Sequence, residues 1–243
     1  MSEYDFLNNV AKTYVGTQHS LFSKAMKDFG FRFFRPFMNG ANALELGSEN
    51  AYFTKKIAGV FSFVDVVEGA RPFADALIKE QIQNVNVTHS LFEEFQSNKK
   101  YDAIFACYIL EHVADVKVIY AIAQKNLAEN GFLFIIVPNA KAFSRQLALR
   151  MNLIDSLYDL TENDLKHGHR RCYDLPLLRQ EITANKMEIA AIGGLMLKPF
   201  ADFQMNQMMA QNMIGEAQLE GLFQMGLENP DMCGSLCVIV TRK

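Results

Sequence analysis

The sequence lacks the features that would place the protein in a membrane or outside the cell. Its longest purely apolar run, Phe132 to Val137, is far shorter than the roughly 20 residues of a membrane-spanning helix. The first residues, MSEYDFLNNVAK, carry early acidic side chains and lack the charged-then-apolar pattern of a secretory signal. These absences predict a cytoplasmic protein without a membrane partner.

The sequence also lacks an excess of basic residues and lacks closely paired cysteines. Its 24 Lys+Arg are outweighed by 27 Asp+Glu, and the formal charge of −3 argues against nucleic acid as a partner. No CxxC pair occurs among Cys107, Cys172, Cys233 and Cys237. We therefore expect buried or free thiols in a reducing compartment, and no nearby His completes a zinc set with the last two cysteines.

What is present suits one globular domain of the α/β class. The chain has 243 residues, of which 50% are hydrophobic and 21% charged, and it contains no internal repeat. From residue 42 onward, short apolar runs alternate with segments long enough for crossover helices. The runs are NALELG, FSFVDVVEG, NVNVTHS, YDAIFACY and GFLFIIVPN. This alternation predicts a parallel sheet with helices on both faces.

Local signals predict several element boundaries. Pro72 fits the first turn of a helix, where its missing N–H costs nothing. Asn130-Gly131 is expected to end a helix over Val116 to Ala128, because Gly readily adopts the left-handed conformation of a helix C-terminus. Further elements are expected at Leu175 to Ala184 (helix), Met187 to Ile192 (strand) and Ser235 to Lys243 (a buried final strand).

The chain is predicted to divide into a helical lid (1–40), a Rossmann-like core (41–195), an insertion (196–232) and a final strand (233–243). The insertion holds seven of the 12 methionines. Because methionine is flexible and fills irregular space, we interpret the insertion as part of the core or as a subunit interface, such as that of a homodimer. A cap over the substrate is the less favoured interpretation.

The segment LELGSENAYFT, residues 44–54, has the position of a nucleotide-cofactor loop but few glycines. Gly47 closes the first expected strand, and Glu68 follows 21 positions later at the end of VDVVE, where an acid binds ribose hydroxyls. Glu49 would repel a pyrophosphate in this loop. A cationic cofactor without phosphate, such as S-adenosylmethionine, fits these acids better than NAD.

Four segments together resemble a known family. ALELGSENAYFT, VDVVEGA, YDAIFACYILEHV and NGFLFIIVPNA are similar, in order and spacing, to successive motifs of the class I S-adenosylmethionine-dependent methyltransferases. PNAKAFSRQLALRMNLI, TENDLKHGHRRCYDL and LKPFADFQ also resemble a bacterial small-molecule subgroup. The resemblance implies a Rossmann-like, doubly wound, mostly parallel seven-stranded α/β sheet with an N-terminal helical lid and a C-terminal helical insertion.

The resemblance also implies which residues bind the cofactor. They are Glu45, Gly47, Ser48 and Glu49 at the methionine end, Glu68 and Gly69 at the ribose, Ser90, Leu91 and Phe92 at the adenine, and Cys107 and Tyr108 beside the sulfonium. Ala51 departs from the family, which has a glycine there. Alanine tolerates a positive φ poorly, so we expect an intact loop only if residue 51 lies in the helical region; a positive φ predicts weaker cofactor binding.

The chemistry of methyl transfer to a hydroxyl calls for a base, and histidine titrates closest to neutral pH. The candidate catalytic residues are His112, His167 and His169, and the candidate acceptor-binding residues are Arg170, Arg171 and Tyr173. His112 is alternatively a helix-start residue that holds the backbone, and the cluster around Gly168 is alternatively a solvated turn. A metal bound by His-x-His with Glu162 or Asp164 ranks third, so no metal is expected. His19 and His89 are expected to be structural.

The predicted function is S-adenosylmethionine-dependent methylation, at oxygen, of a small-molecule or sugar-like acceptor. Two alternatives stay open at this point: a non-catalytic S-adenosylmethionine-binding protein, and an NAD-dependent oxidoreductase. The second is disfavoured because Glu49 and Ala51 make a poor pyrophosphate turn.

Overall fold

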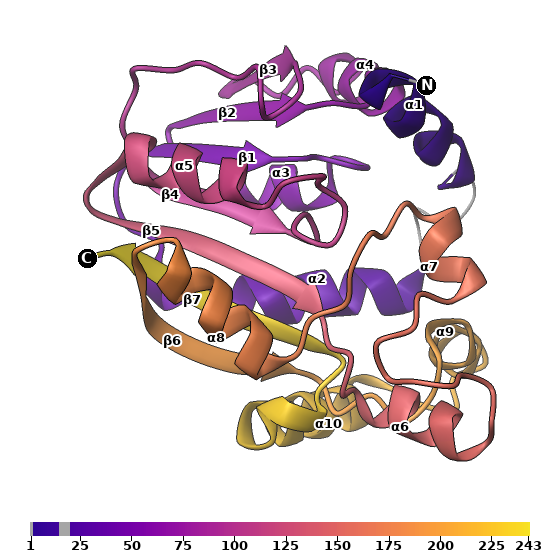
Figure 1. Ribbon diagram of the computed structural model, residues 1–243. Coiled ribbons are helices and arrows are strands. Elements are labelled where there is room, and N and C mark those ends of the chain that lie inside the picture. The colour runs from indigo at the N-terminus through magenta and orange to yellow at the C-terminus, as the bar shows by residue number, and fades with distance from the viewer. Residues whose placement is uncertain (1, 15–19) are drawn as a thin grey trace.

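The computed structural model describes residues 2–14 and 20–243, and its centre is a seven-stranded sheet (Figure 1). The strands follow the order β3-β2-β1-β4-β5-β7-β6. All pairings are parallel except those of β7, which runs antiparallel to both β5 and β6. The strands are β1 (Asn42–Leu46), β2 (Phe63–Glu68), β3 (Val85–His89), β4 (Tyr101–Cys107), β5 (Leu127–Pro138), β6 (Met187–Leu195) and β7 (Ser235–Arg242). The doubly wound, mostly parallel α/β sheet expected from the sequence is confirmed.

Helices cover both faces of this sheet. The α-helices are α1 (Glu3–Thr13), α2 (Leu21–Phe34), α3 (Tyr52–Ala58), α4 (Arg71–Lys79), α5 (Lys117–Asn126), α6 (Phe143–Arg150), α7 (Glu162–Lys166), α8 (Leu175–Ala184), α9 (Asp202–Ala210) and α10 (Glu216–Glu228). Two short 3-10 helices are η1 (Arg35–Phe37) and η2 (Pro230–Met232). Among the residues that the structure describes, no helix is both long enough and apolar enough to cross a membrane.

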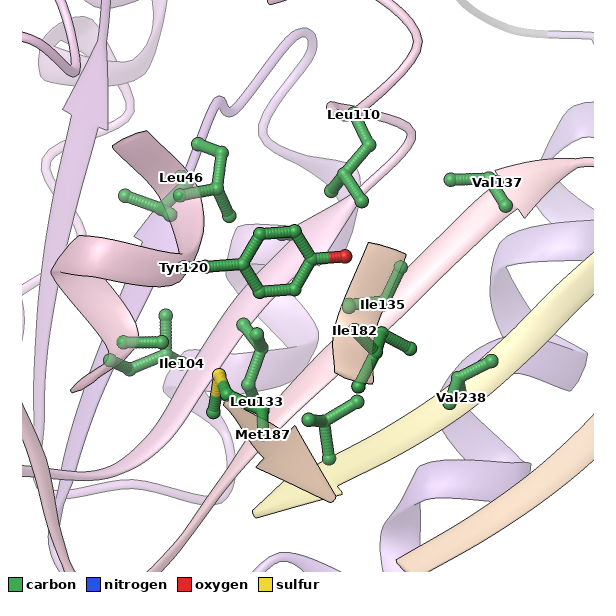
Figure 2. Packing of buried hydrophobic residues seen from close by; sticks show 14 of the residues in the cluster. Leu46, Ile104, Leu110, Tyr120, Leu133, Ile135, Val137, Ile182, Met187 and Val238 are labelled. Carbon is green, nitrogen blue, oxygen red and sulfur yellow. The ribbon is translucent and has the colours of Figure 1, made fainter. Parts of the chain in front are cut away.

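The face that α5 and α8 cover is packed around Tyr120. Figure 2 shows its ring surrounded by aliphatic side chains from strands and helices, among them Leu46, Ile104 and Ile182. The ring is buried, and its hydroxyl donates to Glu181 Oε1 at 2.9 Å. Because a buried hydroxyl needs a partner, this bond joins α5 to α8 while the ring fills the core.

The opposite face is aromatic and is covered by α2 and α3. Phe105 of β4 and Phe134 of β5 stack with their ring centroids 4.8 Å apart, and Phe34 of α2 packs on Phe134 at 4.9 Å. All three rings are buried. The helix α2 is therefore anchored to the sheet by its own apolar side, while α9 packs against α2 and α10 against β6.

The expected helix end at Asn130-Gly131 is wrong. The helix α5 already ends at Asn126, and β5 begins at the next residue. A Cβ on Gly131 would lie 2.8 Å from the backbone oxygen of Tyr101, so glycine is needed for the close approach of β5 to β4. The Gly-containing pair thus marks a strand contact and not a helix cap.

The other expected boundaries agree with the structure. Pro72 lies in the first turn of α4, and α8 spans the residues predicted for it. The strand expected at Met187 continues to Leu195 as β6, and β7 is buried over most of its length. The division of the chain into lid, core and insertion stays a prediction. Within the insertion, Met196 and Met205 are buried whereas Met213 and Met225 are exposed.

The arrowheads of β1, β2, β4 and β5 point toward one edge of the sheet, beyond which α6 and α7 lie (Figure 1). The helix α1 packs against α4. It also reaches across to the segment after α7, because Arg170 pairs with Glu3 at 2.7 Å and Thr13 Oγ1 donates to the backbone oxygen of Lys166 at 3.2 Å. The carboxyl ends of the strands are thereby flanked by the N-terminal helix and by the segments that follow β5.

Candidate functional site

The loop after β1 turns sharply at Gly47, which has a φ of 77°. A Cβ at this position would lie 2.3 Å from Ile109 Cδ1, so the residue needs both the conformation and the small size of glycine. The N–H of Gly47 donates to the backbone oxygen of Val67 at 2.8 Å. This bond holds the ends of β1 and β2 side by side where a ligand would be bound in a doubly wound sheet.

Ala51 has a φ of 61°, so the condition for an intact loop, a helical conformation at residue 51, is not met, and weaker cofactor binding stays the prediction. A left-handed conformation costs a non-glycine residue about 1–2 kcal/mol, because Cβ crowds the following carbonyl. The methyl group of Ala51 is buried in the aromatic core, which offsets part of that cost. The backbone therefore keeps the conformation that a glycine would adopt, under strain.

Glu68 ties the loop after β1 to the end of β2. The side chain is buried, and its carboxylate accepts hydrogen bonds from Ser48 N at 2.8 Å, Ala70 N at 2.8 Å and Ser48 Oγ at 3.2 Å. Burial raises the pKa of Glu68, and these hydrogen bonds oppose the rise. The Glu49 backbone is a further donor to the carboxylate, so the loop after β1 and the end of β2 share Glu68 as their common acceptor. The predicted ribose contact stays a prediction.

Glu45 is a buried acid inside this loop. Only 3% of its surface is exposed, and its Oε2 has no hydrogen-bond partner among residues 2–14 and 20–243. Burial raises the pKa of Glu45 to about 8, although the Thr54 hydroxyl and the Lys27 ammonium lower it. An unpaired buried carboxyl is costly unless a cation or donor satisfies it, so the site fits a ligand with a cationic amine.

Glu49, the second acid of the loop, is paired within the protein. Its Oε2 accepts a hydrogen bond from the Lys27 ammonium of α2, and the lysine is only 9% exposed. The positive φ of Glu49, 47°, is part of the same turn. Because Lys27 neutralises Glu49, the acids of the loop region that remain available to a ligand are Glu45 and Glu68.

The expected adenine loop follows β3 beneath α1. Ser90 Oγ donates to the backbone oxygen of Leu91 at 2.9 Å. Leu91 N donates to the Tyr4 hydroxyl of α1 at 3.3 Å, and Leu7 of α1 and Leu91 both lie close to Gly69. Phe92, in contrast, packs against the core around Tyr120. The helix α1 thus covers Ser90, Leu91 and Gly69, and Phe92 is turned toward the core.

Cys107 and Tyr108 end β4. Tyr108 has a φ of 59°, and its N–H donates to the backbone oxygen of Ile136 at 2.7 Å. Its hydroxyl donates to Ser235 Oγ at 3.2 Å. Burial raises the pKa of both side chains, so both are neutral at pH 7. Contacts of these residues with a sulfonium stay predictions.

Two of the three predicted catalytic histidines meet in one cluster, together with an acid. The rings of His112 and His169 lie edge to face with centroids 4.7 Å apart. Glu111 joins them, and one ligand atom from each of the three residues lies within 4.8 Å of the other two. His169 Nδ1 is 3.4 Å from Asp164 Oδ1. Burial lowers the pKa of His112 to about 3 and lowers that of His169 despite this acid, so both rings are neutral at pH 7.

The remaining predicted site residues have partners within the protein. His167 Nδ1 lies 2.8 Å from the backbone oxygen of Asn163, and its ring packs on Tyr14. The Arg170 guanidinium pairs with Glu3 and lies over Phe6. The Arg171 guanidinium donates to the backbone oxygens of Leu110 and Ala114, and the buried Tyr173 donates to Glu181. Acceptor contacts of these residues stay predictions, as does the structural role of His89, whose Nε2 lies 3.2 Å from the backbone oxygen of Gly69. His19 lies outside the described residues.

Two residues of the site, Glu111 and Lys27, were not predicted from the sequence. Glu111 immediately precedes His112 in the segment ILEHV after β4, and its place among apolar neighbours was the available signal for a buried acid. Lys27 gave no such signal, because a lysine in an amphipathic helix normally points to solvent. Its role depends on a contact between α2 and a loop 22 residues away.

Comparisons with known proteins concern the fold and the family of the chain. A family model described as "Methyltransferase domain" matches residues 18–185. No curated protein sequence matches the chain. Among solved structures, the DhpI-SAM-HEP complex aligns with a TM-score of 0.61 at 13% identity over 99% of each chain.

Two further structures are similar. The plantazolicin methyltransferase BpumL in complex with SAH has a TM-score of 0.60 at 13% identity and covers 99% of this chain and 96% of its own. A possible histamine N-methyltransferase from Thermotoga maritima has a TM-score of 0.64 at 12% identity and covers 98% of this chain and 100% of its own. At such identities these likenesses describe the fold. The family model, however, spans well over half of the sequence, and the chain therefore belongs to the methyltransferase domain family, as its motifs predicted.

Proposed function

We propose that the protein transfers a methyl group from S-adenosylmethionine to an oxygen of a small-molecule or sugar-like acceptor. The observation that carries the proposal is the unpaired, buried carboxyl of Glu45 in the loop after β1. A cationic amine would satisfy the carboxyl and favour its ionised form, whereas a phosphate offers it no positive charge. Family membership and the bound SAM and SAH named for two similar structures support the same cofactor.

In this proposal, the chain's own residues bind and align the two reactants. Glu45 holds the amine of the cofactor, and Glu68, held by Ser48 and Ala70, faces the ribose hydroxyls. The cofactor supplies the methyl group and a good leaving group. Alignment of nucleophile, methyl carbon and sulfur then provides much of the rate enhancement.

Methylation at oxygen also requires loss of a hydroxyl proton. The cluster of Glu111, His112 and His169 supports this step because it combines two neutral imidazoles with a carboxyl group at the carboxyl end of β4. Asp164 beside His169 Nδ1 orients one of the rings, as a carboxylate does for a catalytic histidine.

The proposal is tested by calorimetric titration of S-adenosylmethionine and S-adenosylhomocysteine into the full chain, followed by transfer of a labelled methyl group to a panel of hydroxyl and amine acceptors. Binding with transfer to hydroxyls is the expected result. Binding without transfer to any acceptor would favour the non-catalytic alternative, and absence of binding would refute the proposal.

Further expectations from the sequence accompany this proposal. We expect a cytoplasmic protein with no nucleic acid partner, consistent with the formal charge of −3. A homodimer through the Met-rich insertion is expected to show as a doubled mass in light scattering.

A further inference from the structure

We propose that Glu111, His112 and His169 bind a divalent transition-metal ion, and that the ion holds the acceptor oxygen. The ion site is inferred from the geometry of the three residues, and its role toward the acceptor rests on the proposed function. This departs from the sequence-based expectation of no metal, which considered a different acid for the set.

The three side chains converge from two segments. Glu111 and His112 follow β4, and His169 follows α7. One ligand atom from each lies within 4.8 Å of the others. Bonds of about 2.0–2.2 Å place neighbouring ligand atoms of a tetrahedral ion about 3.4 Å apart, so inward movements of about 1 Å by the side chains close the site.

Glu111 provides an independent reason to expect a cation. Its side chain is 1% exposed, and neither carboxylate oxygen has a hydrogen-bond partner within the described part of the chain. Arg171 lies close enough to influence its charge, yet the guanidinium donates to the backbone oxygens of Leu110 and Ala114 instead. An ion bound between the two imidazoles would satisfy this carboxylate directly.

Both histidines are also held as metal ligands usually are. His169 Nδ1 faces Asp164 Oδ1 at 3.4 Å, which leaves Nε2 as the nitrogen that can bind an ion. The His112 ring lies beside the backbone of Gly168, the residue before His169. Asp164 is itself fixed, because its Oδ2 accepts from Thr161 N at 2.9 Å and Thr161 Oγ1 at 2.8 Å. These neighbours favour ring orientations in which a nitrogen of each histidine is available to an ion.

Two imidazole nitrogens and one carboxylate form a donor set that suits Zn²⁺ and similar first-row ions. Three protein ligands leave a coordination position for an acceptor hydroxyl. Binding there lowers the pKa of the hydroxyl, so its proton passes to water, and with the ion bound the two imidazoles act as ligands in place of bases. The oxygen then forms a bond to the methyl carbon as the sulfur–methyl bond breaks, and the sulfonium becomes a neutral thioether.

The site is tested by titrating Zn²⁺ and Co²⁺ into the full chain after removal of metals with a chelator, using calorimetry for Zn²⁺ and visible absorption for Co²⁺. We expect one ion per chain and Co²⁺ absorption bands typical of nitrogen and oxygen ligands. Loss of an outer partner typically weakens affinity about 10–100-fold, which we expect for Asp164→Asn, and Glu111→Gln or His169→Asn should cost at least about 100-fold.

His167→Asn is the matched control, because His167 lies two residues from His169 and its Nδ1 is occupied by the backbone oxygen of Asn163. It should bind the ions with wild-type affinity. Circular dichroism establishes that each variant folds, and Glu111→Gln should fold at least as well as the wild type without metal. If the wild type binds Zn²⁺ and Co²⁺ no more tightly than Glu111→Gln does, the proposed metal site is wrong. A chain that binds S-adenosylmethionine but neither ion would refute the metal site alone and leave the proposed cofactor in place.

Discussion

Replacing Glu45 by glutamine should make the cofactor-free protein more stable at pH 8 but not at pH 5. Burial raises the pKa of Glu45 to about 8, against an ordinary value of 4.5. Between these pH values the unfolded chain has released the proton that the folded chain still holds, so the folded state loses stability as pH rises. Each pH unit costs up to about 1.4 kcal/mol, and on the order of 4 kcal/mol accumulates by pH 8.

Glutamine has nearly the shape of the protonated carboxyl and does not titrate, so this loss should be absent from the variant. The assay is urea unfolding of both proteins, without cofactor, at several pH values from about 5 to 8. Glu68 and Glu111 also have raised pKa values, so both proteins should lose stability with pH. Only the difference between the free energies of unfolding of the two proteins isolates the effect of Glu45. A difference that stays constant with pH would refute the reasoning.

The same carboxyl should release a proton when the proposed cofactor binds. At pH 7 the buried Glu45 is mostly protonated, and a bound cationic amine favours its ionised form. Calorimetry in two buffers of different ionisation enthalpy measures this release. The wild type should release up to about one proton more than Glu45→Gln, and the variant should bind more weakly. Equal proton release in the two proteins would exclude Glu45 from the cofactor contact.

Three further substitutions test other parts of the site. Ala51→Gly should strengthen cofactor binding, and weaker binding of the variant in calorimetry would contradict this. Its free energy of unfolding should change by less than about 1 kcal/mol, because the relief of about 1–2 kcal/mol of backbone strain is offset by the loss of the buried methyl group and by the flexibility of glycine in the unfolded chain. Glu68→Ala removes the hydrogen bonds from Ser48 and Ala70, so it should destabilise the fold by about 1–3 kcal/mol in urea unfolding. It should also abolish cofactor binding, and retained binding would rule out the ribose contact. Arg171→Lys should destabilise the fold by about 1–2 kcal/mol in urea unfolding, because one ammonium cannot reach the backbone oxygens of both Leu110 and Ala114. Unchanged stability together with a raised KM for the acceptor would instead support the prediction, made from the sequence, that Arg171 binds the acceptor.

The elements of the sheet were predictable because their signals are local. Apolar runs bounded by turn residues define each strand, and the order of four motifs indicated the doubly wound topology. The end of α5 was not predictable in this way. Gly131 is needed where two backbones approach, and a distant carbonyl oxygen determines that requirement.

The candidate site was only partly predictable for a similar reason. His112 and His169 are polar residues at expected strand and loop ends, and the fold brings them together. Arg170 and Arg171 gave the same signal, but their guanidinium groups are bound to Glu3 and to backbone oxygens. Sequence patterns indicate which residues can bind a ligand. They do not indicate which other residues of the protein will bind the same side chains, because those contacts depend on the tertiary fold.

The position of β7 has a consequence for the order in which the protein forms. This last strand lies between β5 and β6, and β6 pairs only with β7 among the described strands. During synthesis, β1 to β5 can pair as each leaves the ribosome, but β6 must wait for a strand that follows it by about 40 residues, or several seconds of translation. Until then the edge of β5 is open, so a stalled or truncated chain presents an apolar strand edge to chaperones and to other chains.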